Sequence, residues 1–506
     1  MRLGVLLSAL PAARLPEGDF EEEINALVCD SRRAKRGSLF VCLRGPERDG
    51  HAYAQDAYAR GCRVFVCEYP PTLPDDARLI YVHDSRAALA DLASAWYGYP
   101  ERELTLIGIT GTKGKTTTAV MIWHLLRAAG IPVGYIGSGG VWYAGVEEQT
   151  ENTTPSAPEL RRAFAAMRRA GVRCVVMEVS SQAICSARVA GLVFSICLFT
   201  NLAEDHIGDG EHPDFCHYRD AKARLFSDYG CRSMIVNLDD KTAPYMMAEA
   251  CAPRVLTISC NRRDATVYAD RIRHARQGAY FGTAFFLHSD AADAVPVSLS
   301  LPGECNVSNA LLALCAAREY LLQEAPGTDA SYRALAHPLA AVTVPGRFEP
   351  VPTAMQDVDF LIDYAHNGYS LCAAITALRA YAPARLVCLF GSVGERTYSR
   401  RAELARAACG ADFCIVTADN PGTEPPEETM REICAVLEEN RREYVAILDR
   451  EEAIRYAVRH ARPGDLVLLA GKGHEDYQLI DSRRLPFSER AILTAAAEER
   501  ESILLF

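Results

Sequence analysis

The stretch IGITGTKGKTTT at residues 107–118 decides the fold of the region around it. Residues 104–109, which lead into it, are mostly apolar and β-branched and predict a buried strand. Residues 116–129 form a long, mainly apolar run without proline or glycine, closed by Gly130 and Pro132, which predicts a buried helix. A strand, a glycine-rich turn, Lys-Thr and a helix, in this order, are the layout of a phosphate-binding loop.

In such a loop the glycines let backbone N–H groups approach phosphate oxygens, a lysine reaches the terminal phosphates, and a hydroxyl ligates Mg²⁺. Lys115 and Thr116 stand at the lysine and hydroxyl positions, although Ile109 replaces a glycine of the general pattern. A glycine-rich turn that binds nothing is the alternative, and the agreement of strand, turn and helix signals disfavours it. The predicted nucleotide contacts in the loop are Gly111, Thr112, Lys113, Gly114, Lys115, Thr116 and Thr117.

Bulk composition narrows the class of protein. The 506 residues are enough for about three domains, and the net charge of −11 argues against a nucleic-acid binder that relies on bulk electrostatics. Residues 1–13 resemble a signal peptide only superficially, because the apolar part is short and holds one basic residue; we expect a short amphipathic helix packed on the first domain. No stretch reaches 18 apolar residues, so no membrane span is predicted.

The 18 cysteines are scattered and include no CxxC pair. In a long chain with ample core, this pattern indicates reduced thiols in a cytoplasmic protein, and it argues against a structural zinc site.

Residues 1–98 read as a small α/β domain, with strands at 38–43 and 63–68 and a helix at 51–60 between them. Asp-Ser-Arg at 30–32 and Asp-Gly-His at 49–51 are, taken alone, ordinary turn or cap signals. Residues 92–100 end in Gly-Tyr-Pro and read as the hinge into a second domain.

Residues 99–342 form the predicted second domain. Strands at 172–177 and 194–202 lead to Glu178 and His206, at the carboxyl ends of strands where ligands bind in open α/β sheets. In isolation Glu178 would read as a cap or surface carboxylate, His206 as structural, and Lys222 on the predicted helix 217–226 as a surface lysine. Thr154, before Pro155, reads equally as a helix N-cap and as a substrate contact.

Residues 343–506 alternate strands with helices, which predicts a parallel sheet covered on both faces. The expected strands are 360–362, 386–390, 414–417 and 466–470. Each is followed by a distinctive motif, namely DYAH, GSVGER, DNPG and GKGHEDYQ. Four motifs at one edge of a sheet favour a binding site over four unrelated turns.

Taken in order, these motifs resemble the Mur ligase family, whose variant phosphate loop TGTxGKTT is shared with folylpolyglutamate synthetases. The Asp-Ser-Arg, Gly-x-Leu-Phe (37–40) and Asp-Gly-His motifs of the first domain are similar to those of MurE-type ligases. The resemblance covers nearly the whole chain. It implies an α/β protein of three domains: 1–98 for the UDP-linked substrate, 99–342 as a central P-loop ATPase with a parallel sheet, and 343–506 as a Rossmann-like, amino-acid-binding domain.

The resemblance also assigns roles to residues at matching positions. It places one Mg²⁺ on Thr116 and Glu178, and a second on His206 and on Lys222 after CO₂ has converted that lysine to a carbamate. Further nucleotide contacts would be Asn309 (with a purely loop-holding amide equally expected), Arg347, Asp363 and His366. The UDP-linked substrate would contact Ser31, Thr153, Thr154, Ser180 and Arg188. The amino acid would contact Arg396, Asp419, Asn420, Gly471 and Glu475.

The implied activity is ATP-dependent amide ligation in peptidoglycan synthesis, through an acyl phosphate, by a monomer acting on small-molecule substrates. A diamino acid such as L-lysine or meso-diaminopimelate would be added to UDP-N-acetylmuramoyl-L-alanyl-D-glutamate. Gly422 stands where diaminopimelate-adding relatives usually carry an arginine that clamps the far carboxylate, and a glycine cannot form that clamp. Either another residue, of which Arg396 is one candidate, holds the carboxylate, or the amino acid lacks it, and the sequence slightly favours the second interpretation.

Two alternatives remain at this stage. One is another ligase of the superfamily, including a folylpolyglutamate synthetase, against which the first-domain motifs argue. The other is a non-catalytic nucleotide-binding paralogue, supported by departures from the family pattern at Gln182, Ser186, Gly422 and around Gly394-Glu395. The catalytic set Lys115, Glu178, His206 and Lys222 argues against it.

Overall fold

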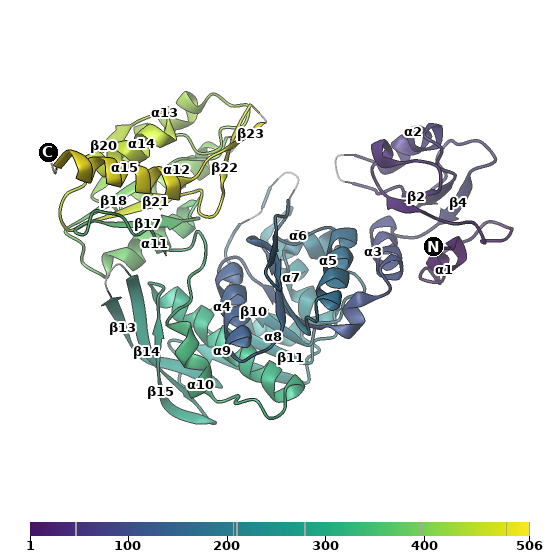
Figure 1. The fold of residues 1–506 in the computed structure, drawn as a ribbon, viewed down its shortest axis with the longest axis horizontal. Helices are drawn as coiled ribbons and strands as arrows, with labels where there is room; N and C mark the ends of the chain where they lie inside the picture. The colour runs from purple at the N-terminus through teal and green to yellow at the C-terminus, as the bar shows by residue number, and fades with distance from the viewer. Residues whose placement is uncertain are drawn as a thin grey trace. The chain divides into compact units, whose positions relative to one another are not determined.

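The computed structural model describes residues 1–45, 48–205, 207–208, 211–277, 280–394, 397–481 and 483–504. The chain forms two compact units (Figure 1). The first comprises Met1–Tyr268 with Ser308–Leu335, and the second comprises Ala269–Val307 with Ala336–Phe506.

The N-terminal part of the first unit is a four-stranded parallel sheet in the order β1-β2-β3-β4. Its elements are α1 (Leu3–Leu7), β1 (Ala26–Val28), β2 (Ser38–Val41), α2 (Ala54–Ala59), β3 (Val64–Cys67), β4 (Arg78–Tyr81) and α3 (Ser85–Trp96). The predicted amphipathic N-terminal helix is confirmed as α1, with Leu3, Leu6 and Leu7 buried in the core of this sheet.

Two boundaries in this region differ from the sequence prediction. The expected helix 51–60 begins as a 3₁₀ turn, Gly50–Tyr53, because the Asp49 side chain accepts from the His51 backbone N–H and tightens the first turn. The helix α3 continues to Trp96, so residues 92–96 of the predicted hinge 92–100 are helical. The break lies in the second half of that segment, at Tyr99, which has a left-handed φ of 53°.

The central sheet of the first unit surrounds the phosphate-loop strand. Six parallel strands run in the order β12-β11-β10-β5-β9-β6, and antiparallel β7 and β8 extend the β6 edge. The strands are β5 (Thr105–Thr110), β6 (Val133–Gly137), β7 (Gly140–Tyr143), β8 (Val146–Glu148), β9 (Cys174–Glu178), β10 (Ile196–Phe199), β11 (Ser233–Asn237) and β12 (Arg254–Ser259). Every residue of β9, β10 and β11 is buried, which is why these strands read as continuous apolar runs rather than as alternating patterns.

Helices cover this sheet. They are α4 (Lys115–Ala128), α5 (Ala157–Arg169), α6 (Ser181–Cys185), α7 (Phe215–Ser227), α8 (Ala243–Glu249), α9 (Glu304–Glu324) and α10 (Tyr332–Leu339). The helices predicted after the phosphate loop and around Lys222 are confirmed as α4 and α7. Beyond β12 the chain continues with three further strands, β13 (Val267–Gln277), β14 (Tyr280–Ser289) and β15 (Ala292–Leu299).

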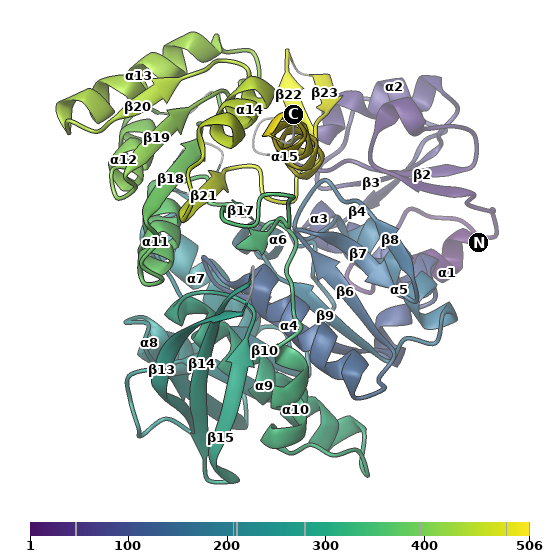
Figure 2. The same ribbon diagram turned by 60° about the vertical axis from the view of Figure 1, so that its left-hand side comes forward.

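The second unit contains the six-stranded sheet β16-β17-β21-β18-β19-β20, parallel apart from β16. Its strands are β16 (Glu349–Pro350), β17 (Asp359–Asp363), β18 (Arg385–Phe390), β19 (Phe413–Val416), β20 (Tyr444–Ala446) and β21 (Asp465–Ala470). The helices α11 (Gly368–Arg379), α12 (Tyr398–Ala408) and α13 (Pro426–Glu439) lie on one side, and α14 (Arg450–His460) and α15 (Glu489–Leu504) on the other (Figure 2). A hairpin of β22 (Tyr477–Ile480) and β23 (Arg483–Pro486) follows β21.

The four strands predicted from the C-terminal sequence are all present and parallel, so their four motifs meet at one edge of the sheet.

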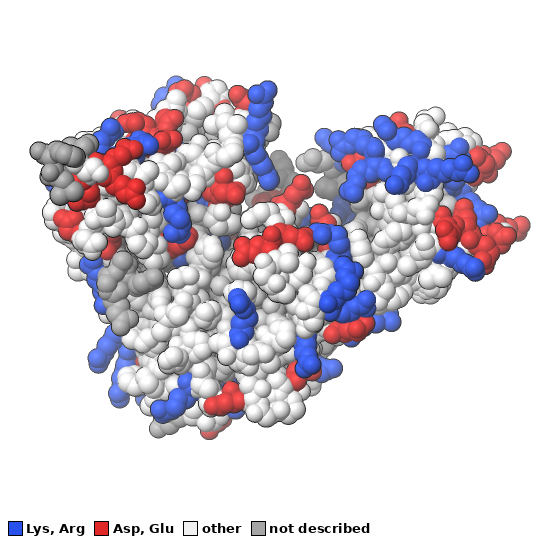
Figure 3. Space-filling model, viewed as in Figure 1, with Lys and Arg blue, Asp and Glu red and all other residues white. Residues whose placement is uncertain are grey.

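Acidic and basic side chains are interspersed on the face shown in Figure 3. Over the part of the chain that the structure describes, no helix is both long and apolar enough to cross a bilayer.

Candidate functional site

The phosphate loop joins β5 to α4 through two glycines that no other residue could replace without strain. Gly111 and Gly114 adopt left-handed φ angles of 147° and 85°. A Cβ at Gly111 would overlap the Thr200 hydroxyl, and one at Gly114 would overlap the amide oxygen of Asn309. The loop therefore packs directly against Thr200 and Asn309, which only glycine permits at these two positions.

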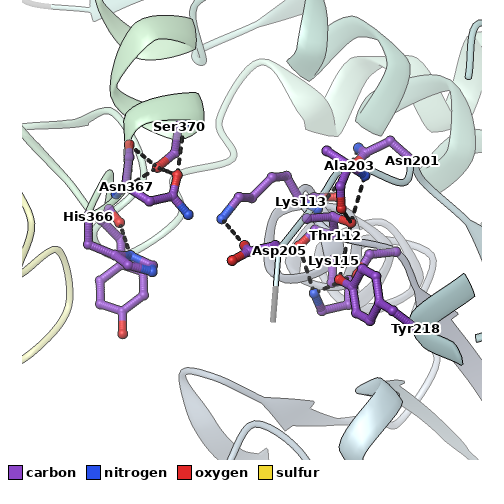
Figure 4. A network of polar contacts seen from close by, with 12 residues as sticks. Thr112, Lys113, Lys115, Asn201, Ala203, Asp205, Tyr218, His366, Asn367 and Ser370 are labelled. Atoms are coloured by element: carbon purple, nitrogen blue, oxygen red, sulfur yellow. Dashed lines mark hydrogen bonds and ion pairs between the residues drawn. The ribbon is translucent and has the colours of Figure 1, made fainter. Parts of the chain in front are cut away.

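The two loop lysines are held in different directions (Figure 4). Lys115 turns back over the loop, where its Nζ donates to the carbonyl oxygens of Gly111 (2.9 Å) and Thr112 (3.0 Å). Lys113 points to Asp205, and its Nζ lies 3.0 Å from the carboxylate. Lys115 thus stands over the turn, in the place from which a P-loop lysine contacts phosphate.

Glu178 and Thr116 meet as the sequence predicted. Glu178 is fully buried at the end of β9, and its Oε2 accepts from the Thr116 hydroxyl at 3.0 Å. Its Oε1 accepts from Tyr135 Oη and from the Ser138 backbone N–H, both at 2.9 Å. The isolated reading of Glu178 as a surface carboxylate is therefore wrong. A carboxylate and a hydroxyl at this distance form a hard oxygen pair of the kind that Mg²⁺ prefers.

Lys222 is buried rather than exposed, which also overturns its isolated reading. It is 2% exposed, and its Nζ donates to the Gly111 carbonyl at 2.9 Å. Burial, reinforced by the nearby charge of Lys115, lowers the pKa of the Lys222 ammonium well below its ordinary value of 10.5. Lys115 and Lys222 therefore converge on the same carbonyl, although 106 residues lie between them in the chain (222 − 115 − 1).

The segment that follows β10 is hydrogen-bonded to the phosphate loop through Asn201. Asn201 Oδ1 accepts from the Lys113 backbone N–H at 3.0 Å, and its Nδ2 donates to the Lys113 carbonyl at 3.1 Å. The Thr112 hydroxyl lies 3.1 Å from Tyr218 Oη and so links the loop to α7. The predicted ligand His206 lies outside the described residues.

Four residues predicted to contact the UDP-linked substrate form one cluster beside Glu178. Thr154 is fully buried; its hydroxyl donates to the Glu178 carbonyl (2.8 Å) and accepts from the Ser180 N–H (3.1 Å). Arg188 donates to the Thr154 carbonyl at 2.8 Å, and the Thr153 hydroxyl lies 3.0 Å from that of Ser138. Thr154 is therefore the buried centre of this cluster, and Thr153, Ser180 and Arg188 are partly exposed.

The N-cap reading of Thr154 is wrong. Helix α5 begins at Ala157, and its cap is Ser156, whose backbone N–H and hydroxyl both bond Glu159 in a capping box. Glu159 closes this box, so the first turn of α5 begins two residues further along the chain than a cap at Thr154 would place it.

The remaining candidates of the first unit are Ser31, which lies in a local turn, and Asn309, whose partners are distant in the chain. Ser31 is 8% exposed in a 3₁₀ turn whose cap, Asp30, accepts from the Arg32 N–H at 2.9 Å, so the Asp-Ser-Arg motif is indeed a capped turn. Asn309 Oδ1 accepts from the Thr118 hydroxyl at 3.2 Å and lies against Gly114. Asn309 therefore holds the loop, which is one of the two roles expected for it.

In the second unit, three predicted amino-acid contacts surround Lys472, which the candidate set did not include. Lys472 is fully buried; its Nζ donates to Asn420 Oδ1 (2.9 Å) and Glu475 Oε2 (3.1 Å) and lies 3.6 Å from Asp419 Oδ1. Burial raises the pKa of Asp419. Lys472 was visible in the GKGHE motif, but sequence alone could not tell an enclosed lysine from a solvated one.

Two glycines with left-handed backbone, Gly471 and Gly422, lie in the motifs that form the Lys472 cluster. Gly471 has a φ of 118°, and a Cβ there would lie 2.6 Å from Asp419 Oδ2. Gly422 has a φ of 63°; its N–H donates to the Leu479 carbonyl (3.1 Å) and its carbonyl accepts from Asp481 (2.8 Å). Residue 422 is thus fixed in a left-handed conformation against the β22–β23 hairpin. Arg396 lies outside the described residues.

The nucleotide contacts predicted in the second unit lie around Tyr364. The Arg347 guanidinium stacks 4.6 Å from the Tyr364 ring centroid, and His366 Nδ1 lies 2.8 Å from the Tyr364 carbonyl oxygen. Asp363 Oδ2 accepts from the Phe348 N–H at 2.8 Å. Tyr364 Oη donates to Glu475 Oε1 at 3.3 Å and so connects this group to the amino-acid cluster.

Comparison with known proteins finds three family matches along the chain. Residues 23–97 match the Mur ligase family catalytic domain, residues 109–317 the Mur ligase middle domain, and residues 346–473 the Mur ligase glutamate ligase domain.

Curated relatives match over nearly full length. A UDP-N-acetylmuramoyl-L-alanyl-D-glutamate–2,6-diaminopimelate ligase of Geobacillus kaustophilus is 39% identical over 99% of this chain and 100% of the relative. Ligases of the same name from Caldanaerobacter subterraneus (36% identity; 96% and 97% covered) and Clostridium botulinum (32%; 99% and 100%) also match.

Solved structures agree with this similarity. A structure of a ligase of that name is 27% identical, with a TM-score of 0.68 and 99% coverage of both chains. Mycobacterium tuberculosis folylpolyglutamate synthase, complexed with ADP and AMPPCP, is 19% identical with a TM-score of 0.59 over 82% of this chain and 94% of the synthase, so it shares the fold.

Proposed function

Because this chain belongs to the Mur ligase family, we propose that it is an ATP-dependent ligase that joins 2,6-diaminopimelate to UDP-N-acetylmuramoyl-L-alanyl-D-glutamate. The observation that carries the proposal is the phosphate site of the first unit. There Lys115, Lys222 and the Thr116–Glu178 pair surround Gly111 and Gly114, as an enzyme that transfers a phosphoryl group requires.

The reaction has to activate a carboxylate, which is a poor acyl donor because oxide is a poor leaving group. The acceptor carboxylate attacks the γ-phosphate of ATP, forming an acyl phosphate and ADP. The amine of the amino acid then attacks the acyl carbon and displaces phosphate. In this scheme Lys115 stabilises negative charge on the transferring phosphoryl group, and the backbone N–H groups of the loop orient the nucleotide.

Thr116 and Glu178 fit a Mg²⁺ ion, because their oxygens already share one hydrogen bond and the carboxylate is anionic and enclosed. Mg²⁺ would neutralise phosphate charge when it is bound. His206 and the carbamate of Lys222 remain the proposed ligands of a second ion.

Carbamylation of Lys222 is supported by its environment. Only a neutral amine attacks CO₂, and burial of the Nζ favours the neutral form at a pH far below the ordinary pKa of lysine. The product would be an anion on a side chain that is cationic when exposed.

The three-domain division 1–98, 99–342 and 343–506 is part of the proposal, and the three separate family matches support it. So is the assignment of Ser31, Thr153, Thr154, Ser180 and Arg188 to the UDP-linked substrate. We also propose that the enzyme works in the cytoplasm as a monomer; its cysteines are all free thiols, which suits a reducing compartment.

The choice of amino acid rests on two opposed observations. Gly422 slightly favoured a substrate without a second carboxylate, whereas the curated relatives above are named for diaminopimelate. We give the relatives more weight, because similarity extends over the whole chain. Asn420 and Glu475 would then hold the amino acid, and the far carboxylate would be bound by groups other than residue 422.

The test is a ligation assay with Mg-ATP and UDP-N-acetylmuramoyl-L-alanyl-D-glutamate, run separately with meso-diaminopimelate, L-lysine and L-ornithine. We expect phosphate release that requires both the nucleotide peptide and diaminopimelate. Release with L-lysine alone would restore the interpretation of Gly422. ATP binding without turnover for any amino acid would favour the non-catalytic paralogue.

A further inference from the structure

Three metal-ligating side chains that have no part in the proposed phosphate chemistry come together where α6 meets α7. Cys185 is the last residue of α6, His217 lies in the first turn of α7, and His212 lies in the segment that leads into α7. Their Sγ and ring nitrogen atoms all lie within 4.8 Å of one another. All three belong to the first unit.

The two histidines face each other through the same ring atom. Nδ1 of His212 lies 2.8 Å from Nδ1 of His217, with the ring centroids 5.0 Å apart. His212 is 1% exposed, and its Nε2 lies 2.8 Å from the Ser181 hydroxyl. A hydrogen bond at the second ring nitrogen is the usual device that fixes the orientation and tautomer of a metal-bound histidine.

The solvent exposure of two of the ligands and the spacing of the two histidines in the sequence also suit a metal site. Cys185 and His217 are exposed, so an ion can enter from solvent while the buried His212 is already oriented. The histidines are separated by four residues, within the His-x₃₋₅-His spacing of zinc sites. Tetrahedral coordination with zinc bonds of about 2.0–2.3 Å places ligand atoms roughly 3.3–3.8 Å apart. Metal binding would therefore bring the widest-spaced ligand atoms closer by up to about 1 Å and would separate the two Nδ1 atoms, now 2.8 Å apart, by about 0.5 Å.

We propose that Cys185, His212 and His217 form a site for a transition-metal ion of the Zn²⁺ class, with the fourth position open to water. A thiolate with two imidazoles selects Zn²⁺ or Co²⁺ over Mg²⁺, which takes oxygen ligands. The ion ties α6, which follows the Ser180 cap, to α7, which carries Lys222. The absence of CxxC pairs in the sequence argued against a structural zinc site; this proposed site uses one cysteine and two histidines instead.

The experiment is a Co²⁺ titration of tag-free, chelator-treated full-length protein, followed by absorption spectroscopy. We expect a thiolate-to-cobalt charge-transfer band in the near ultraviolet and tetrahedral d–d bands in the visible. Both should saturate at one equivalent and disappear when Zn²⁺ is added. Co²⁺ bound at the oxygen ligands proposed for Mg²⁺ would give no thiolate band.

Cys185→Ser should abolish the charge-transfer band, and His217→Ala should weaken Co²⁺ binding at least ~10-fold. Cys216→Ser is the matched control, because Cys216 is an exposed thiol next to His217 but outside the cluster. Far-ultraviolet circular dichroism confirms that each variant folds. A wild-type spectrum without a thiolate band, or a band that Cys185→Ser retains, would overturn the proposal.

Discussion

Replacing Glu178 with glutamine separates the structural role of this carboxylate from its role as a metal ligand. The glutamine carbonyl can still accept from Tyr135 and Ser138, while its NH₂ group meets the Thr116 hydroxyl, which can rotate to accept. What changes is the charge. A hydrogen bond to a charged group contributes about 1.5–3 kcal/mol and a bond to a neutral group about 0.5–1.5 kcal/mol, so each of the three bonds weakens by about 1–1.5 kcal/mol. Burial of a neutral amide costs less than burial of a carboxylate and offsets part of this, so the net loss of stability should be about 1–3 kcal/mol.

Activity should respond much more strongly. Loss of one preorganised charge-stabilising group typically costs about 10²–10³ in kcat, equivalent to about 2.7–4 kcal/mol in the transition state. Glu178→Gln should therefore melt only a few degrees below wild type, yet lose phosphate release by about two orders of magnitude or more at saturating ATP.

Two further variants complete the assay. Tyr135→Phe removes one hydrogen bond to Glu178 but keeps its charge, so it should melt at a similar temperature to Glu178→Gln while losing less than ~10-fold in activity. Glu147→Gln, at an exposed position of β8, should change neither quantity. Glu178→Gln that keeps half of the wild-type rate at all Mg²⁺ concentrations would refute the assignment of Glu178 as a metal ligand.

Three other predictions follow from the same geometry. Lys222→Met should abolish ligation. Burial lowers the pKa of Lys222 in the folded protein, so the unfolded chain binds the lysine proton more tightly and wild-type stability falls as the pH drops below about 10.5. The variant should therefore melt at a higher temperature than wild type at neutral pH, but not near pH 10.5. Full ligation by Lys222→Met would rule out the carbamate. Gly114→Ala combines left-handed strain of about 1–2 kcal/mol with overlap on Asn309 and should eliminate ADP binding in calorimetry. Gly130→Ala is the control: its φ of 80° is similar but the space around it is open, so it should lose only the stability that the strain costs. Gly422→Arg should raise the ratio of kcat/KM for diaminopimelate over L-lysine by about 10-fold or more, through a charge-assisted bond to the second carboxylate; an unchanged ratio would show that residue 422 does not face that group.

Local chemistry predicted the elements well where it was unambiguous. The strand, turn and helix of the phosphate loop lie within one residue of their expected bounds, because the apolar runs and left-handed glycines admit one arrangement. The α5 cap shows the limit. Thr154 and Ser156 are both good cap residues close to a proline, and the Thr154 hydroxyl bonds the Glu178 carbonyl and the Ser180 N–H instead of capping the helix.

The burial of three charged side chains could not be predicted from the sequence. Glu178, Lys222 and Lys472 each look like surface residues in isolation, and each is enclosed because partners distant in the chain satisfy it. Resemblance to a family named the first two as functional, but it could not show their burial. In the Cys185–His212–His217 cluster only the spacing of the two histidines was visible in the sequence, because Cys185 comes from a separate segment that joins them when α6 packs on α7.

The central claim is that the chain joins an amino acid to the acceptor carboxylate through an acyl phosphate. The most direct measurement uses UDP-N-acetylmuramoyl-L-alanyl-D-glutamate labelled with oxygen-18 in its carboxylates, with Mg-ATP and meso-diaminopimelate, and mass analysis of both products. The account predicts a tripeptide nucleotide together with inorganic phosphate that has acquired one labelled oxygen. Unlabelled phosphate with no gain in peptide mass would contradict it.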